Sequence, residues 1–178
     1  MAARTISDFK AQLIGGGARP NQFEVELSFP PFVTLGVQAG QKALFMVMAA
    51  SLPPSNLDTA PAPFRGRIVY TAGERTFDPW SVTVLNDTDF VIRNAMEQWQ
   101  QAMNNNLTNL GLTNPSSYQS RALVHQLARS GERLKSYTFE GMFPTHVSPI
   151  ELAMDSNNVI EQFQVTFMYQ FWTSNTTG

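Results

Sequence analysis

The sequence predicts a mainly β fold: an antiparallel β-sandwich or barrel of about seven strands, with one packed α-helix and a short N-terminal helix. Several segments alternate apolar and polar residues, which is the two-residue period of a half-buried strand. Only residues 88–103 combine helical spacing of apolar residues with the length of an ordinary helix. Strands and helices do not alternate along the chain as a parallel sheet requires. We therefore expect residues 1–178 to form a single domain.

The chain begins with a predicted arm, residues 1–18. A short helix in this arm has three apolar residues at helical spacing: Ile6, Phe9 and Leu13. Thr5 or Ser7 can cap the start of this helix with a hydroxyl oxygen. Gly15–Gly17 end it. Because no strand precedes these glycines and no Lys-Ser/Thr pair follows them, they indicate a flexible hinge rather than a phosphate-binding loop.

A clear strand is predicted at residues 22–29, where Pro30 and Pro31 end it because proline cannot donate to a strand ladder. Its two faces differ: Phe23, Val25, Leu27 and Phe29 on one, and Gln22, Glu24, Glu26 and Ser28 on the other. Residues 42–52 predict a second extended segment. Residues 53–64 contain four prolines and no apolar periodicity, so we expect an extended loop within the domain.

Residues 65–87 predict a β-hairpin that turns near Gly73-Glu74. The second strand of this hairpin has an apolar face formed by Trp80, Val82 and Val84. Pro79 marks either the start of that strand or a sheet edge. The sequence thus predicts that the segments before and after Gly73 pair with each other as strands.

The predicted helix follows at residues 88–103, with Asp87 or Thr88 as its cap. It carries one apolar stripe: Ile92, Met96, Trp99 and Met103. Such a stripe is typical of a core-facing helix rather than of a cofactor site. Three further strands are predicted, at residues 122–128, 134–143 and 161–172. The last alternates throughout, with Phe163, Val165, Phe167, Tyr169 and Phe171 opposite Gln162, Gln164, Thr166, Met168 and Gln170.

The composition limits the possible functions. Twelve Lys and Arg, nine of them Arg, against fourteen Asp and Glu give a formal charge of −2, which argues against tight nucleic-acid binding because that needs a clustered basic surface. The absence of cysteine excludes disulfides and thiolate metal sites. No apolar run is long enough to span a membrane, and the N-terminus lacks the apolar core of a signal peptide. We therefore expect the chain to stay in the cytoplasm in which it is made.

No residue pattern predicts catalysis. His125 and His146 lie far apart and have no metal-type partner at a fixed offset, so we expect structural roles for both. Glu24 and Glu26 share a strand face and could support acid–base chemistry, but a solvated strand face is the favoured interpretation. The expectation is a protein that is not an enzyme and that uses no cofactor and no metal.

Several stretches, taken in order, resemble one family. "RPNQFEVELSF", "AGERTFDPWSVTVLND", "GMFPTHV" and "DSNNVIEQFQVTFMYQFW" run from about Arg19 to Trp172 and are similar to the tail tube proteins of contractile-tailed, myovirus-type bacteriophages. The resemblance implies a structural virion protein that forms hexameric rings. These rings would stack into the rigid inner tail tube through which DNA is ejected into the host cell.

The resemblance also implies partners and a location. The partners would be further copies of this chain, the tail sheath protein, a baseplate or tube initiator, the tape measure protein and the tail terminator. DNA would pass through the lumen without specific binding, and this chain would insert into no membrane. Assembly would take place in the host bacterial cytoplasm, and the product would be part of the virion tail. The alternatives are the inner tube of a bacterial contractile injection or type VI secretion system and, in another class, a ligand-binding β-sandwich module.

Three groups of residues are candidates for roles in such a tube. The expected lumen-facing residues, which could instead face the outer sheath, are Glu24, Glu26, Gln162, Gln164 and Gln170. Leu57 and Phe64, apolar residues in the proline-rich segment, are the expected contacts between rings. Arg75, Asp78 and Asp87 are expected either to pair with neighbouring subunits or to tie the hairpin to the helix cap within one subunit.

Overall fold

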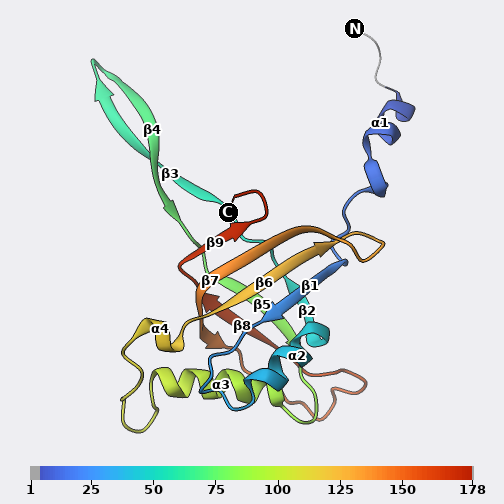
Figure 1. The fold of residues 1–178 in the computed structure, drawn as a ribbon, viewed down its shortest axis with the longest axis vertical. Coiled ribbons are helices and arrows are strands. Elements are labelled where there is room, and N and C mark those ends of the chain that lie inside the picture. The colour runs from blue at the N-terminus through green and yellow to red at the C-terminus, as the bar shows by residue number, and fades with distance from the viewer. Residues whose placement is uncertain (1–4, 178) are drawn as a thin grey trace.

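The computed structural model describes residues 5–177 and contains one large antiparallel sheet and one separate hairpin (Figure 1). The large sheet has the order β1 (Phe23–Leu27), β6 (Ser120–Leu127), β7 (Arg133–Val147), β8 (Gln162–Met168), β5 (Trp80–Leu85) and β2 (Val47–Ala50), with β9 (Phe171–Ser174) also paired to β7. The hairpin consists of β3 (Asn56–Phe64) and β4 (Arg67–Thr76). The predicted class, mainly antiparallel β, is confirmed.

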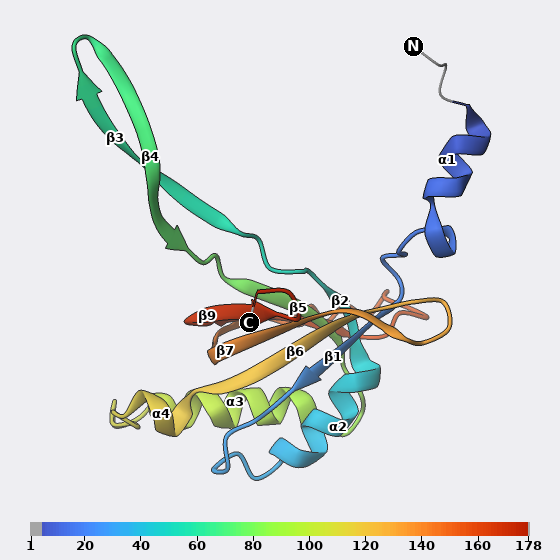
Figure 2. The ribbon, with the colours of Figure 1, turned by 45° about the horizontal axis from the view of Figure 1, so that its top comes forward.

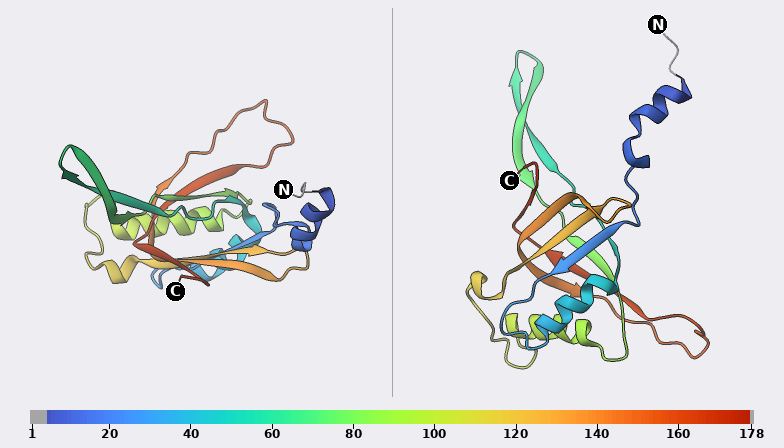
Figure 3. Two further views of the ribbon diagram at one scale, coloured as in Figure 1. Left: turned by 90° about the horizontal axis from the view of Figure 1, so that it is seen from above. Right: turned by 45° about the vertical axis from the view of Figure 1, so that its right-hand side comes forward.

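The long strand β7 folds the large sheet into two layers. Its first part pairs with β6 and β9, and its last part pairs with β8. One layer is therefore β1–β6–β7–β9 and the other is β7–β8–β5–β2. In the view from above in Figure 3, α3 (Val91–Met103) is seen between these two layers. This arrangement is a sandwich in which β7 belongs to both layers.

The alternating residues of the strands meet in one core. Trp80 of β5 stacks on Phe139 of β7 with ring centroids 4.4 Å apart, and both side chains are buried. Val82, Val84 and Val165 are also buried, as the two-residue period predicts. Full burial of one large apolar side chain stabilises the fold by roughly 1.5–3 kcal/mol. These facing strand residues are therefore the main source of stability.

Two helices pack beside the core, where the sequence predicted one. In α3, the stripe residues Ile92, Met96 and Trp99 are buried, which confirms the predicted apolar face. The second helix is α2 (Gly36–Met46), which contacts β1 and α3. The predicted extended segment at residues 42–52 was therefore partly wrong, because residues 42–46 are helical and only 47–50 form a strand. A short apolar run does not distinguish the two states by itself.

Small residues explain how α2 packs against the sheet. Ala39 and Ala43 are four residues apart and fully buried. Between them, Gly40 lies so close to β1 that an added Cβ would be 2.9 Å from the backbone oxygen of Leu27. Because glycine has no Cβ, α2 can approach β1 closely at this position. The small residues thus form a packing face that a hydropathy pattern based on large residues does not reveal.

The predicted cap of α3 was wrong. Phe90 occupies the N-cap position with a left-handed φ of 53°, and neither Asp87 nor Thr88 caps the helix. Asp87 instead accepts from Lys42 of α2 at 2.6 Å, and Asp89 also binds Lys42. The carboxylate of Asp89 accepts from the backbone N–H of Val91 at 3.2 Å. The two aspartates thus link the start of α3 to α2.

Residues 53–87 differ most from the prediction. Residues 56–64 are a strand rather than a loop, and Gly73 lies inside β4 rather than at a turn. The hairpin turns at Arg65-Gly66, and β5 pairs with β2 and β8 rather than with β4. The correct turn has positive φ at both central residues, 44° and 82°, as a type I′ turn requires.

The two ends of the chain follow the sequence in part. Helix α1 (Ile6–Gln12) begins with a capping box between Thr5 and Asp8, as the predicted Thr5 cap requires, and has no buried residue. A 3-10 turn, η1 (Ile14–Gly16), and α4 (Pro115–Tyr118) are the other short helical elements of the described residues. The predicted final strand is interrupted: β8 ends at Met168, and Phe171 is exposed in β9.

Candidate assembly surface

The β3–β4 hairpin extends away from the sandwich, on the same side as the N-terminal arm and opposite to α2 and α3 (Figures 1 and 2). Its ladder runs from Asn56 opposite Thr76 to Phe64 opposite Arg67, with one irregularity between Leu57 and Thr59. It has no second layer of the sandwich against it. Every residue of β4 except Gly73 is exposed.

The hairpin carries an unusual amount of exposed apolar surface. Five large apolar side chains on it are more than half exposed: Leu57, Phe64, Ile68, Val69 and Tyr70. Two of them, Leu57 and Phe64, were predicted as contacts from the sequence. The other three were missed because β4 was placed in a packed hairpin with β5. The signal that could have located them is the Arg65-Gly66 pair between two apolar runs.

Prolines distinguish the two edges of this hairpin. Pro61 and Pro63 lie in β3, opposite Tyr70 and Ile68 of β4. Proline has no N–H, so the outer edge of β3 cannot accept another strand in a regular ladder. The outer edge of β4 contains no proline. The hairpin is thus protected from strand addition on one edge only.

The base of the hairpin is fixed to the sandwich by hydrogen bonds. The indole N–H of Trp80 donates to the carbonyl of Ser51 at 2.8 Å, and that of Trp172 donates to the carbonyl of Pro54 at 3.0 Å. Asn56 donates to the carboxylate of Asp78 at 2.6 Å. The two ends of the hairpin are therefore held while its tip is free.

The three predicted charges lie in two places. Arg75 donates to the hydroxyl of Ser55 at 3.3 Å, and Asp78 accepts from Asn56, so both are at the hairpin base. Asp87 is at the junction of α2 and α3, where it binds Lys42. The structure therefore brings Arg75 and Asp78 into one region and separates them from Asp87.

The predicted lumen residues lie on both layers of the sandwich. Gln162 and Gln164 are exposed on the outer face of β8, opposite the buried Phe163 and Val165. Gln170 lies at the bend between β8 and β9, where its backbone N–H donates to the carbonyl of Glu140. Glu24 and Glu26 lie on the outer face of β1, in the other layer. These five residues thus do not share one strand face.

The two glutamates form a polar cluster with residues of the neighbouring strands. Arg133 of β7 donates to Glu24 at 3.2 Å and to Glu26 at 2.6 Å. His125 of β6 is paired with Glu24 in the ladder, and its Nε2 lies 3.3 Å from a carboxylate oxygen of Glu26. The sequence did not predict this proximity because His125 is about a hundred positions away from the glutamates.

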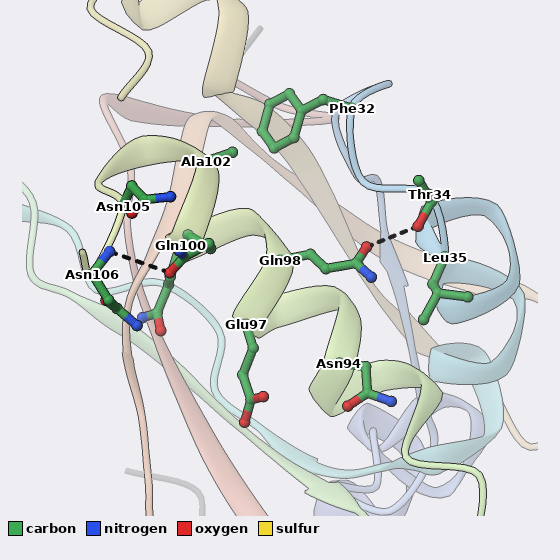
Figure 4. Close-up of a pocket in the computed structure, with 11 residues that line it drawn as sticks. Phe32, Thr34, Leu35, Asn94, Glu97, Gln98, Gln100, Ala102, Asn105 and Asn106 are labelled. Carbon is green, nitrogen blue, oxygen red and sulfur yellow. Dashed lines mark hydrogen bonds between the residues drawn. The ribbon is translucent and has the colours of Figure 1, made fainter. Parts of the chain in front are cut away.

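A shallow groove of about 850 Å³ lies along α3 (Figure 4). Amide side chains dominate it: Asn94, Gln98, Gln100, Gln101, Asn105 and Asn106. Thr34 donates to Gln98 at 3.1 Å, and the carboxylate of Glu97 accepts from Arg93 at 2.9 Å. The groove has no nucleophile beside a base, so it does not resemble a catalytic site.

Within the described part of the chain, no helix is long and apolar enough to cross a membrane.

Comparison with known proteins identifies the family. The family model described as phage tail tube protein matches residues 18–175. The tail tube protein gp19 of Enterobacteria phage T4 is 35% identical over 159 residues, which cover 89% of this chain and 92% of that protein.

Two solved structures have a similar fold. The tube-terminating cap of the anti-feeding prophage has a TM-score of 0.62 at 18% identity, covering 98% of this chain and 94% of that one. The sheath–tube complex of an extracellular contractile injection system contains a chain with a TM-score of 0.60 at 13% identity, covering 97% and 99%. The chain therefore belongs to the phage tail tube protein family, a structural and non-catalytic component of the virion tail.

Proposed function

We propose that this chain forms hexameric rings that stack into the rigid inner tube of a contractile phage tail, and that the β3–β4 hairpin makes the contact between rings. The exposed hairpin is the observation that carries this proposal. A two-stranded sheet without a covering layer is marginally stable by itself. Its five exposed apolar side chains favour a second copy of the chain as the missing layer.

The direction and stiffness of the hairpin suit a contact along the tube axis. The hairpin extends from one side of the sandwich only (Figure 2). Pro61 and Pro63 restrict its backbone, so less conformational entropy is lost when it docks. Phe64 and Ile68 lie near the tip, opposite Arg67 and Pro63, so they present apolar groups on the two faces of the hairpin; Arg65 lies over the Phe64 ring. These residues would be the buried anchor between rings, together with Leu57 at the base.

A shortened hairpin tests the contact. Replacing residues 61–70 by Asn-Gly joins Ala60 and Thr71, which are ladder partners, through a two-residue turn. We expect folded subunits that form single rings but no tubes, as seen by negative-stain electron microscopy. Phe64→Ser combined with Tyr70→Ser should have the same effect, whereas Glu74→Gln on the same hairpin should leave tube formation unchanged. Tubes of normal length from the shortened chain would refute the assigned contact.

We further propose that the outer face of β5 and β8 lines the channel. Its side chains are uncharged and most are polar: Ser81, Thr83, Gln162, Gln164 and Thr166, with Leu85 and Met168 at its ends. Such a wall offers phosphates no cation to bind, so DNA can slide past it. The other layer carries Arg121 and Arg133 at its outer face, so it suits a DNA channel less well. Glu24 and Glu26 belong to that layer.

Lysine substitutions on the two faces test this assignment. Gln162→Lys with Gln164→Lys should slow DNA ejection, because each subunit of every ring would then present cations to passing phosphates. Glu24→Lys with Glu26→Lys should have little effect on ejection. The opposite result would assign the channel to the β1 layer.

The other partners follow from the tube role. We propose contacts with a sheath protein, a terminator, a baseplate or tube initiator and the tape measure protein. A sheath–tube complex and a tube-terminating cap are the assemblies named for the two similar structures, which supports the first two. The 35% identity with a phage protein, against 13–18% with the injection-system chains, favours a phage tail over an injection machine.

A further inference from the structure

The cluster of Glu24, Glu26 and His125 has the composition of a metal site. One ligand atom from each residue lies within 4.8 Å of the other two. The antiparallel pairing of β1 and β6 produces this group, because Glu24 is directly opposite His125. The His125 Nε2 and the Glu26 oxygen are 3.3 Å apart, close to the separation of about 3.4 Å between two ligands on a tetrahedral zinc ion.

The histidine is held in the orientation that a metal ligand needs. Its side chain is 2% exposed, and its Nδ1 lies 2.7 Å from the hydroxyl of Ser136. When Nδ1 donates to that hydroxyl, the lone pair of Nε2 faces the glutamates. Among the described residues, this Nε2 has no hydrogen-bond partner. In metal-binding histidines, the ring nitrogen that does not bind the metal typically donates to an oxygen of a neighbouring group, and this hydrogen bond fixes the orientation of the ring.

We propose that Glu24, Glu26 and His125 bind a divalent transition-metal ion, with Zn²⁺ as the best match. Two carboxylates and one imidazole favour such an ion over Mg²⁺ or Ca²⁺, which prefer oxygen ligands alone. With water as a fourth ligand, the ion would join the edge strand β1 to β6. It would also place a cation between the buried imidazole Nε2 and the carboxylate oxygen of Glu26.

Arg133 is the competitor for this site. Its guanidinium binds both glutamates, but half of its side chain is exposed. It can therefore move into solvent when the ion enters. In this arrangement Arg133 neutralises the carboxylates in the metal-free protein. Removing its charge should strengthen metal binding, whereas removal of a residue that merely stabilises the fold would not.

Zinc titration of the purified full-length chain by isothermal calorimetry tests the proposal. We expect one Zn²⁺ per chain and no comparable binding of Mg²⁺. His125→Gln and Glu26→Gln should each weaken binding by more than the roughly 10–100-fold that loss of an outer partner causes, and Ser136→Ala should fall in that range. Arg133→Gln should bind about tenfold more tightly.

The matched control is His146→Gln, which removes the other histidine of the chain and should not alter binding. Circular dichroism reports whether each variant is folded. If His125→Gln does not fold, Glu24→Gln and Glu26→Gln decide the matter, since both side chains are partly exposed. No saturable zinc binding to the wild-type chain and to Arg133→Gln would overturn the proposal. Binding that is unchanged by both glutamate substitutions would also overturn it.

Discussion

The sandwich and the β3–β4 hairpin are built from similar residues, yet only the sandwich buries them. β8 alternates between buried apolar and outward polar residues, and its Phe163, Val165 and Phe167 are in the core. β4 contains Ile68, Val69 and Tyr70, and all three are more than half exposed. Both segments are antiparallel strands. The difference is a second layer, which β8 has within the subunit and β4 does not.

This comparison separates two sources of stability. The sandwich is stabilised by contacts that form as soon as one chain folds. The hairpin is fixed only at its base, through the indole groups of Trp80 and Trp172. Substitutions in the sandwich should therefore lower the stability of the subunit, and substitutions in the hairpin should lower its assembly.

The largest effect is expected at Trp80, which is 2% exposed and stacks on Phe139. Trp80→Ala removes this contact and the hydrogen bond to Ser51, so the free energy of unfolding should fall by about 3–5 kcal/mol. Urea denaturation of the unassembled subunit measures this. Tyr70→Ala in the hairpin, which removes a comparably large ring, should change the same quantity by less than about 0.5 kcal/mol. Equal losses would contradict the separation of the two regions.

The next effect compares two glycines that have the same close contact. An added Cβ would lie 2.9 Å from the oxygen of Leu27 at Gly40, and 2.9 Å from the oxygen of Asp58 at Gly73. Overpacking costs about 1–3 kcal/mol, and the better helix propensity of alanine returns up to about 1 kcal/mol at Gly40.

Gly40→Ala should therefore lower subunit stability by about 1–2 kcal/mol. Gly73→Ala should leave subunit stability almost unchanged but shorten or abolish tubes, because Gly73 lies at the irregularity of the hairpin ladder. Denaturation and electron microscopy of both variants give the two readouts. A large loss of stability for Gly73→Ala would show that the hairpin stabilises the sandwich.

A smaller, pH-dependent effect is expected at the junction of α2 and α3. The hydrogen bond from Lys42 holds the pKa of Asp87 below its usual value, with help from the backbone N–H of Thr88, and Lys42 is also the main cause of the lowered pKa of Asp89. The lowered pKa means that the stabilisation is present above the unfolded carboxyl pKa of about 3.9 and is lost as the pH falls through the folded value.

Replacing Lys42 tests this junction. The wild-type urea midpoint should decrease below about pH 4 more steeply than that of Lys42→Gln. Hydrogen bonds to Asp87 and then Asp89 raise the pKa of Lys42, so the same contribution is also lost at strongly alkaline pH. Lys10→Gln, on the N-terminal arm, is the charge-matched control and should reproduce the wild-type profile. Parallel profiles for all three proteins would show that the junction does not contribute.

The sequence predicted the elements whose pattern is local. The alternation in residues 162–168 and the stripe of Ile92, Met96 and Trp99 each mark a buried face, so that strand and that helix were identified; Ala95 is also buried on the helix face. Helix α2 was missed, and one reason is that its packing face consists of small residues, such as Ala39 and Ala43. Such residues give little hydropathy contrast.

The assembly surface and the glutamate cluster were harder to predict for different reasons. Pairing of β4 with β3 rather than β5 depends on the Arg65-Gly66 turn, and prolines on β3 concealed the strand. The proximity of His125 to Glu26 depends on the register between β1 and β6, which spacing in the sequence does not specify. Long-range register is therefore the information that the sequence pattern lacked.

The smallest effect is expected for removal of the Tyr169 hydroxyl, and it tests whether this polar group stabilises the sandwich core. The side chain is 5% exposed and its ring contacts Phe139 edge-on at 4.9 Å, but its hydroxyl has no hydrogen-bond partner among the described residues. Burial, and secondarily the charge of Asp78, raises the pKa of this hydroxyl. An unpaired buried hydroxyl costs about 1–3 kcal/mol in desolvation. Tyr169→Phe should thus leave stability unchanged or raise it slightly, while Tyr169→Ala, which also removes the ring, should lower it by about 3–5 kcal/mol. Thermal and urea unfolding of the two variants give the comparison. A clear loss of stability in Tyr169→Phe would show that the hydroxyl does have a partner, such as an ordered water molecule bound near Asp78.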